Sequence, residues 1–80
     1  MASAILETKI ERQPLKSHKL VSAGYDSDTW TFEVELKNGK VFQYYGVPEY
    51  IYKLFEEEDA KARFFDEYIK DAGYSFSQVD

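Results

Sequence analysis

The sequence predicts an α+β domain, in which a small antiparallel sheet of three to four strands is covered by two helices. Two observations lead to this prediction. Apolar and polar residues alternate over residues 30–36, directly before a hairpin signal, and apolar residues recur at helical spacing between Pro48 and Gly73. Eighty residues suffice for one domain with one modest core. We expect residues 1–19 to form an N-terminal arm and residues 20–80 to form the domain.

The first strand is expected over residues 15–23, after an arm whose residues 1–14 hold a turn or two of weak helix. The sequence AGYDSD that follows is typical of a turn. In this turn we expect Gly24 to take an unusual dihedral angle and Asp26 to accept backbone hydrogen bonds. An alternative interpretation places Tyr25 and Asp26 at the rim of a pocket.

The clearest strand is TWTFEVEL, in which apolar and polar side chains alternate with a period of two. This alternation predicts one water-facing set, Thr31, Glu33 and Glu35, and one core-facing set, Trp30, Phe32, Val34 and Leu36. The sequence KNGK then predicts a hairpin.

The length of the hairpin loop decides which side chains are buried. A two-residue Asn38-Gly39 loop would pair Val34 with Gln43 and turn Gln43 toward the core. A three-residue loop with Gly39 in a left-handed conformation would instead pair Val34 with Phe42 and Phe32 with Tyr44. A slip of one residue reverses every side chain. We prefer the three-residue loop because it buries the rings.

The segment GVPEYIYKLFEEED is expected to begin a helix with Pro48 at the first helical position, where its missing N–H costs nothing. The inner face of this helix comprises Ile51, Leu54 and Phe55. Asp59 is expected to cap a second helix, which Gly73 ends. The inner stripe of the second helix comprises Ala62, Phe65, Ile69 and Ala72. The tail YSFSQV alternates and is consistent with an edge strand.

From Ser22 to Phe55 the sequence resembles the KTSC domain, a small module named for its similarity to a C-terminal region of lysyl-tRNA synthetase. Family members tend to run Ser, a short gap and Gly-Tyr-Asp, then an alternating strand, an Asn-Gly or Asp-Gly hairpin, Tyr-x-Tyr, Val-Pro and a helix. The matching positions are Ser22, Gly24, Tyr25, Asp26, Asn38, Gly39, Phe42, Tyr44, Val47 and Pro48. The resemblance covers roughly residues 20–79.

The chain departs from the family pattern at three places. The family commonly has Ser-x-Gly at the start of the second helix, a Tyr/Phe-Phe-Asn run and a basic tail. Here these places hold Ala60-Lys61-Ala62, Phe64-Phe65-Asp66 and the ending DAGYSFSQVD. If the family binds RNA, as its name suggests, this member has lost much of the positive charge that such binding would use. Small stand-alone members occur in bacteria and their phages.

Composition and charge limit the classes of site. The absence of cysteine excludes disulfides and thiolate chemistry and suits a cytoplasmic protein, and no apolar run approaches membrane-spanning length. The net charge of −5 disfavours non-specific binding of RNA or DNA. The best candidate for a local basic patch comprises Lys9, Arg12, Lys16, His18 and Lys19.

The sequence shows no catalytic signature. His18, the single histidine, has no nucleophile or orienting partner in its surroundings, so we expect a structural or solvent-facing role. The acidic run EEED lacks the alternating oxygens and glycine turn of a calcium loop and is expected to be solvated. The glycines are scattered, so no phosphate-cradling loop is visible. We therefore predict no catalytic residue, no cofactor and no metal.

The chain holds more large rings than one small core needs. Tyr45, Tyr50 and Tyr52 have no obvious place inside, and Phe64 and Tyr68 lie off the second helical stripe. Surplus exposed rings indicate an interface, or stacking on a nucleotide whose phosphate would meet nearby cations. The predicted ligand-binding residues are Tyr25, Asp26, Tyr45, Tyr50, Tyr52, Lys61 and Arg63.

These patterns together predict a non-enzymatic binding module. We expect a homo-oligomer that associates through exposed aromatic side chains and sequesters a small anionic ligand such as a nucleotide. A phage-type accessory or counter-defence protein would fit the small size and the acidic charge. One alternative is an RNA- or tRNA-binding module, which the synthetase resemblance implies. The other alternative is a protein–protein interaction domain without a small ligand.

Overall fold

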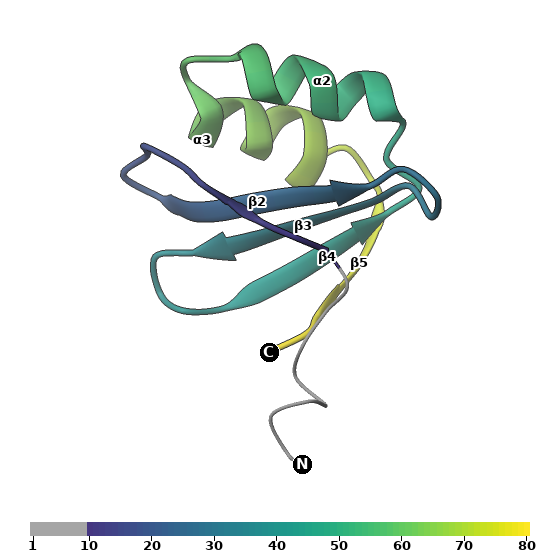
Figure 1. Cartoon of the computed structure of the whole chain (residues 1–80), viewed down its shortest axis with the longest axis horizontal. Coiled ribbons are helices and arrows are strands. Elements are labelled where there is room, and N and C mark those ends of the chain that lie inside the picture. Colours follow the sequence, from purple (N-terminus) through teal and green to yellow (C-terminus); the bar gives the residue numbers. More distant parts are fainter. Residues whose placement is uncertain (1–9) are drawn as a thin grey trace.

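The computed structural model describes residues 10–80, which fold into a five-stranded antiparallel sheet with helices on one face (Figure 1). The strands lie side by side in chain order: β1 (Gln13–Pro14), β2 (Leu20–Asp26), β3 (Thr31–Leu36), β4 (Val41–Tyr45) and β5 (Ser75–Gln78). The helical segments are α2 (Glu49–Glu57), α3 (Lys61–Phe65) and the π-helical η1 (Asp66–Lys70).

The predicted α+β class is therefore confirmed, but the predicted number of strands is too low by one. The additional strand is β1, which the arm contributes by pairing Gln13 with Ala23 and Pro14 with Ser22. The expected weak helix lies mostly over residues 1–9, outside the described residues. The part of the arm that is described is extended instead of helical.

The β3–β4 hairpin has the predicted three-residue loop. Gly39 has a φ of 89°, its N–H donates to the Leu36 carbonyl, and Val34 pairs with Phe42. The Asn38 side chain accepts the Lys40 N–H at 2.9 Å. The expected register, which turns Phe42 and Tyr44 toward the helices, is confirmed.

The turn predicted over residues 23–28 is wrong, because β2 continues through Asp26. The chain reverses at residues 27–30, where Trp30 takes a φ of 56° and its carbonyl accepts the Val47 N–H. This left-handed conformation takes Trp30 out of the strand alternation, and its side chain is 52% exposed. The predicted burial of Trp30 is therefore also wrong.

Gly24 lies where the arm crosses β2. A Cβ atom at this position would lie under 3.0 Å from both the Glu11 carbonyl oxygen and Ile10 Cγ2. Its φ is not positive, so the unusual dihedral angle that we expected is absent. The requirement for glycine comes from the close approach of two backbones.

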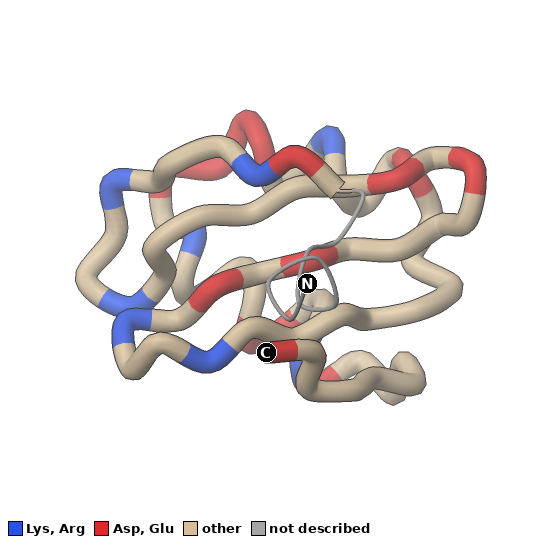
Figure 2. Tube along the Cα trace, turned by 60° about the horizontal axis from the view of Figure 1, so that its bottom comes forward, with Lys and Arg blue, Asp and Glu red and all other residues tan. Residues whose placement is uncertain are grey.

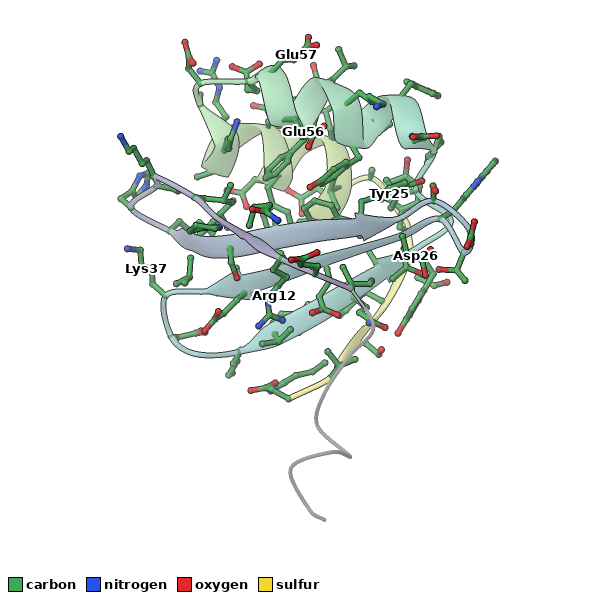
Figure 3. All side chains as sticks on the ribbon, viewed as in Figure 1. Arg12, Tyr25, Asp26, Lys37, Glu56 and Glu57 are labelled. Atoms are coloured by element: carbon green, nitrogen blue, oxygen red, sulfur yellow. The ribbon has the colours of Figure 1, made fainter. Side chains whose placement is uncertain are left out.

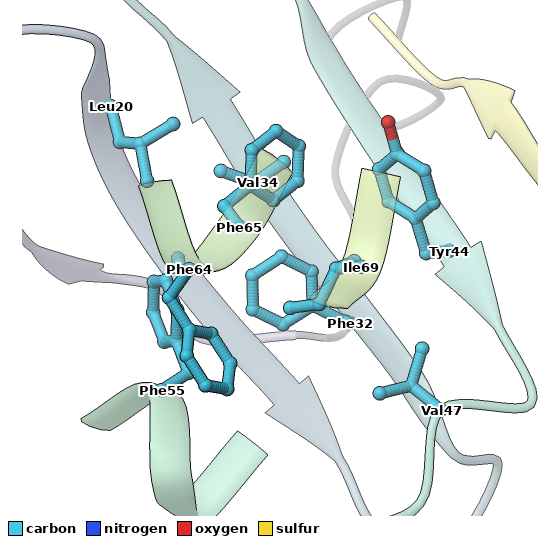
Figure 4. Packing of buried hydrophobic residues seen from close by; sticks show 10 residues of the cluster. Leu20, Phe32, Val34, Tyr44, Val47, Phe55, Phe64, Phe65 and Ile69 are labelled. Atoms are coloured by element: carbon cyan, nitrogen blue, oxygen red, sulfur yellow. The ribbon is translucent and has the colours of Figure 1, made fainter. Parts of the chain in front are cut away.

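The core lies between the helices and β2–β4 (Figure 4). Phe32 at its centre packs against Phe55 at 5.2 Å and Phe65 at 6.0 Å between ring centroids. The buried members of this cluster are Leu20, Ala23, Phe32, Val34, Tyr44, Val47, Phe55, Phe64, Phe65 and Ile69.

Several predicted details of the helices differ from the structure. Leu54 is 50% exposed and Ala72 is also exposed, whereas Phe64 is buried because it packs against Phe55 between the two helices. Asp59 does not cap the second helix: the N-cap is Ala60, with no side-chain hydrogen bond.

The beginning of α2 is shifted by one residue from the prediction, since Pro48 is its N-cap and not its first helical residue. The other end of α2 is capped by a cation. Lys61 Nζ donates to the carbonyls of Phe55, Glu56 and Glu58 at 3.0, 2.9 and 2.6 Å. These carbonyls lie at the C-terminal end of α2 and its C-cap, where positive charge is stabilising.

The outer face of the sheet, away from the helices, carries a polar network. Glu33, expected to face water, is fully buried because the arm covers it. Arg12 bonds one Glu33 oxygen at 2.5 Å and Gln43 Nε2 donates to the other at 2.8 Å. The Tyr45 hydroxyl extends the network to Gln43 and to Ser77. The prediction of a water-facing Glu33 is therefore wrong.

Candidate functional site

Two of the predicted ligand-binding residues form a stacked pair between β2 and α2. The rings of Tyr25 and Tyr52 lie 5.0 Å apart at an interplanar angle of 12°, and the Tyr25 hydroxyl donates to the Val47 carbonyl at 2.5 Å. Burial raises the pKa of both hydroxyls, and the nearby carboxylate of Glu49 also raises the pKa of Tyr25. Both rings pack against the core, so this pair has a structural role.

The remaining predicted residues do not gather around that pair. Asp26 accepts the Asp28 N–H at 2.9 Å and so stabilises the β2–β3 turn. Tyr45 lies on the outer face, where it bonds Ser77. Tyr50 is 66% exposed on α2.

Lys61 and Arg63 lie together at the α2–α3 connection, in a shallow recess of about 270 Å³ that Lys16 and His18 also line. Lys61 and Arg63 therefore lie beside Lys16 and His18, which belong to the predicted basic patch. However, Lys61 is engaged by the α2 carbonyls, and Asp59 lies in the same recess. Of the rest of the patch, Arg12 is paired with Glu33 and Lys9 lies outside the described residues.

A second recess combines aromatic and basic side chains, and we call it the Phe76 groove. It has a volume of about 350 Å³ and lies between the β3–β5 half of the sheet and η1. Phe76 is 59% exposed, stacks on Tyr44 at 5.4 Å, and contacts Phe42 edge-on at 6.2 Å. Its lining residues are Lys19, Leu36, Asn38, Lys40, Phe42, Tyr44, Phe65, Lys70, Asp71 and Phe76.

Three lysines surround the aromatic side chains of the Phe76 groove. Lys19 is held by Asp66 at 2.6 Å. Lys40 and Lys70 form no ion pair within the described residues and are exposed. Burial, followed by the nearby Asp66 and Asp71 carboxylates, raises the pKa of Tyr44, which therefore remains a neutral hydroxyl at physiological pH.

Charge is distributed unevenly along the sheet. The loops at 15–19 and 37–40 lie at the same end, because Leu20 pairs with Leu36. In Figure 2 several basic segments gather at this end and acidic segments mark the opposite turns, and Figure 3 shows Lys37 and Asp26 at opposite ends. The chain thus has a basic end although its net charge is −5.

The sequence did not identify the Phe76 groove. The signals were the hairpin register, which turns Phe42 and Tyr44 inward, and the alternation of the tail around Phe76. Neither signal indicates a groove by itself, because the three rings come together only through the pairing of β5 with β4, which places Tyr44 opposite Phe76. Lys40 and Lys70 come from distant segments, so their proximity follows from the tertiary fold alone.

Comparison with known proteins identifies the family. The sequence profile of the KTSC domain matches residues 16–74. The chain belongs to the KTSC domain family. It is similar to the crystal structure of a KTSC domain protein from Yersinia pestis, at 35% identity and a TM-score of 0.82, over 89% of this chain and 99% of that one. It is also 31% identical to an uncharacterized protein of Stutzerimonas stutzeri, over 89% of this chain and all of the relative.

Two further features of residues 10–80 concern other classes of site. This part of the KTSC domain protein contains no helix long and apolar enough to cross a bilayer. Over the same residues, no three histidine or acidic side chains gather in a way that could hold a metal ion.

Proposed function

We propose that this KTSC domain protein is a non-enzymatic binding module that holds a small anionic ligand with a planar ring, such as a nucleotide, in the Phe76 groove. The observation that supports the proposal is the exposed Phe76 ring beside Lys40 and Lys70, two lysines that form no ion pair with any residue from 10 to 80. Stacking of a base on an aromatic side chain contributes about 1–3 kcal/mol. Ammonium groups donate charge-assisted hydrogen bonds to phosphate oxygens.

The size and the local charge of the groove support the same class of ligand. Its volume of about 350 Å³ lies near the lower end of the range for small-molecule sites, about 300–1,000 Å³. In its lining, Lys40 and Lys70 face the Asp71 carboxylate, and the third lysine, Lys19, is paired with Asp66. A locally positive cleft attracts an anion even on an acidic protein.

The lining favours binding over chemistry. It contains aromatic and aliphatic side chains, lysines, Asn38 and a single carboxylate. A general base with a nucleophile in hydrogen-bond reach is not part of this set. Sequestration of a nucleotide signal, the role expected of a phage-type counter-defence protein, would require only such binding.

Isothermal titration calorimetry with AMP, adenosine and inorganic phosphate tests the proposal. AMP should bind. Adenosine should bind more weakly because it lacks the phosphate for the lysines, and inorganic phosphate should bind more weakly because it lacks the ring that stacks on Phe76. Phe76→Ala, which removes the stacking surface, should weaken AMP binding about tenfold or more. Lys70→Gln should also weaken it and should reduce its salt dependence.

Two exposed residues outside the groove provide matched controls. Tyr50→Ala removes an exposed ring, and Arg63→Gln removes an exposed cation from the other recess. Both should bind AMP as the wild type does. An affinity that is unchanged in Phe76→Ala, or lost equally in Tyr50→Ala, would place the ligand elsewhere. If no nucleotide of a broader panel binds, the proposal fails.

The basic end of the sheet supports RNA as a second candidate ligand. Lys16 and Lys37 lie at that end but outside the lining of the Phe76 groove. An RNA would therefore lose affinity in Lys16→Gln and Lys37→Gln, whereas AMP would not. Gel shifts with tRNA at low salt distinguish the two ligands.

A further inference from the structure

Within residues 10–80, no other strand pairs with the outer edge of β5. β5 pairs with β4 on one side, without any register shift over Ser75–Gln78, and it is the last strand of the sheet. Val79 N–H donates to the Val41 carbonyl at 2.8 Å. Because partners alternate along an antiparallel ladder, Ser75 and Ser77 also bond toward β4. The N–H and C=O groups of Phe76 and Gln78 consequently point away from the sheet.

This edge lacks the features that commonly protect edge strands. β5 contains no proline, no charged residue and no bulge. The edge at the other side of the sheet is different, because β1 has only two residues and one of them is Pro14. The side chain of Phe76 is 59% exposed and adds apolar surface to the β5 edge.

We propose that β5 is a dimer interface, at which the β5 strands of two copies pair antiparallel about a two-fold axis beside Ser77. In this register Phe76 of each copy lies opposite Gln78 of the other. Their outward N–H and C=O groups then form four hydrogen bonds. Isologous pairing of this kind closes with two subunits, because each edge is used once.

The charge distribution favours a second copy as the occupant. Two chains with a net charge of −5 repel at long range, so they approach most readily where local negative charge is low. β5 itself is uncharged, and the Asp80 carboxylate beside it accepts a hydrogen bond from Gln78 Nε2 at 2.9 Å and lies near Lys40. An uncharged edge also offers nothing that would select a charged peptide.

The pairing joins the Phe76 grooves of the two copies. Phe76 and Gln78 project to the helix-covered face, since Phe76 pairs with Tyr44 and Gln78 with Phe42. The two Phe76 side chains would therefore lie on the same face, close to the two-fold axis. The interface does not require that the grooves bind a nucleotide, so the two proposals can fail separately.

Light scattering from micromolar to millimolar concentration tests the interface. The mass should rise from that of the 9.4 kDa chain to twice that value. The rise should be gradual, because four hydrogen bonds and two rings form a small interface. Gln78→Pro removes an outward N–H without removing a bond to β4, and it should remain monomeric at every concentration. Gln78→Ala keeps the N–H and should dimerise.

Amide hydrogen exchange gives a second readout that needs no substitution. Protection of the Phe76 and Gln78 amides should increase with concentration, whereas the Val79 amide should be protected throughout. A wild type that stays monomeric at millimolar concentration would overturn the proposal, as would a Gln78→Pro variant that dimerises normally. Because Gln78 does not line the groove, AMP binding by Gln78→Pro tests the proposed function separately.

Discussion

The two faces of the sheet are stabilised in different ways. On the helix-covered face, Phe32, Phe55 and Phe65 pack ring against ring and are almost completely buried. On the outer face, the equally buried Glu33 is held by Arg12 and Gln43. Alternation in a sequence therefore separates two faces, but it does not reveal whether the polar face is wet. Substitutions on each face can test this contrast.

The largest loss of stability is expected from a substitution on the helix-covered face. Phe65→Ala should lower the free energy of unfolding by about 3–5 kcal/mol, because it opens a cavity beneath the helices. Chemical denaturation followed by circular dichroism measures the change. Tyr68→Ala, at a 52% exposed position on η1, should cost far less. Equal losses in the two variants would mean that Phe65 is not a core residue.

The next largest loss of stability is expected from a substitution on the outer face. Glu33→Ala should cost about 3 kcal/mol, because it leaves the partly buried Arg12 and Gln43 without their acceptor. Glu56→Ala, an exposed carboxylate on α2, is the matched control and should be almost neutral. A double-mutant cycle with Arg12→Ala should show a clear coupling energy. A neutral Glu33→Ala would mean that the outer face is open to water.

A substitution at Gly24 tests whether the arm excludes water from the outer face. Gly24→Ala should cost about 1–3 kcal/mol, because its methyl group meets the Glu11 carbonyl and the arm must move. Exchange of the β2 amides should also become faster. Gly39→Ala is a useful comparison, since it adds strain at a φ of 89° without any clash. If Gly24→Ala were neutral, the arm would not be closely packed on β2.

The smallest expected effect on stability at neutral pH comes from ionisation of the tyrosines on the helix-covered face. Burial raises the pKa of Tyr25, Tyr44 and Tyr52 above the usual 10.0. The unfolded chain therefore loses these protons at lower pH than the folded chain does. Their contribution to stability is complete below about pH 10 and is lost as the pH rises through the folded values. The melting temperature should be level from pH 7 to 9 and fall above 10, in step with tyrosinate absorbance.

The sequence predicted what depends on local rules. Gly39 after Asn38 specified the hairpin, and the resulting register placed Phe42 and Tyr44 correctly. It also predicted the β5 strand and the end of the second helix near Gly73, where φ is 92°. In each case a few neighbouring residues determine the conformation.

The sequence did not predict what depends on contacts between distant segments. Glu33 is buried by the arm, twenty-one positions earlier in the chain, and Gly24 is required by the same contact. Trp30 satisfied the alternation pattern, but the turn overrode it. The predicted ligand residues were separated for a similar reason: Tyr25 and Tyr52 pack together, whereas Tyr45 lies on the other face.

The strand order also has a consequence for the route by which the chain folds. Because β1 to β5 lie in chain order, β1–β2, β2–β3 and β3–β4 each join segments that are neighbours in sequence. Only β4–β5 spans the helices. A topology with mostly local contacts has a low contact order, which correlates with rapid folding. We expect the β2–β4 meander to form early, and the docking of β5 after the helices to complete the sheet.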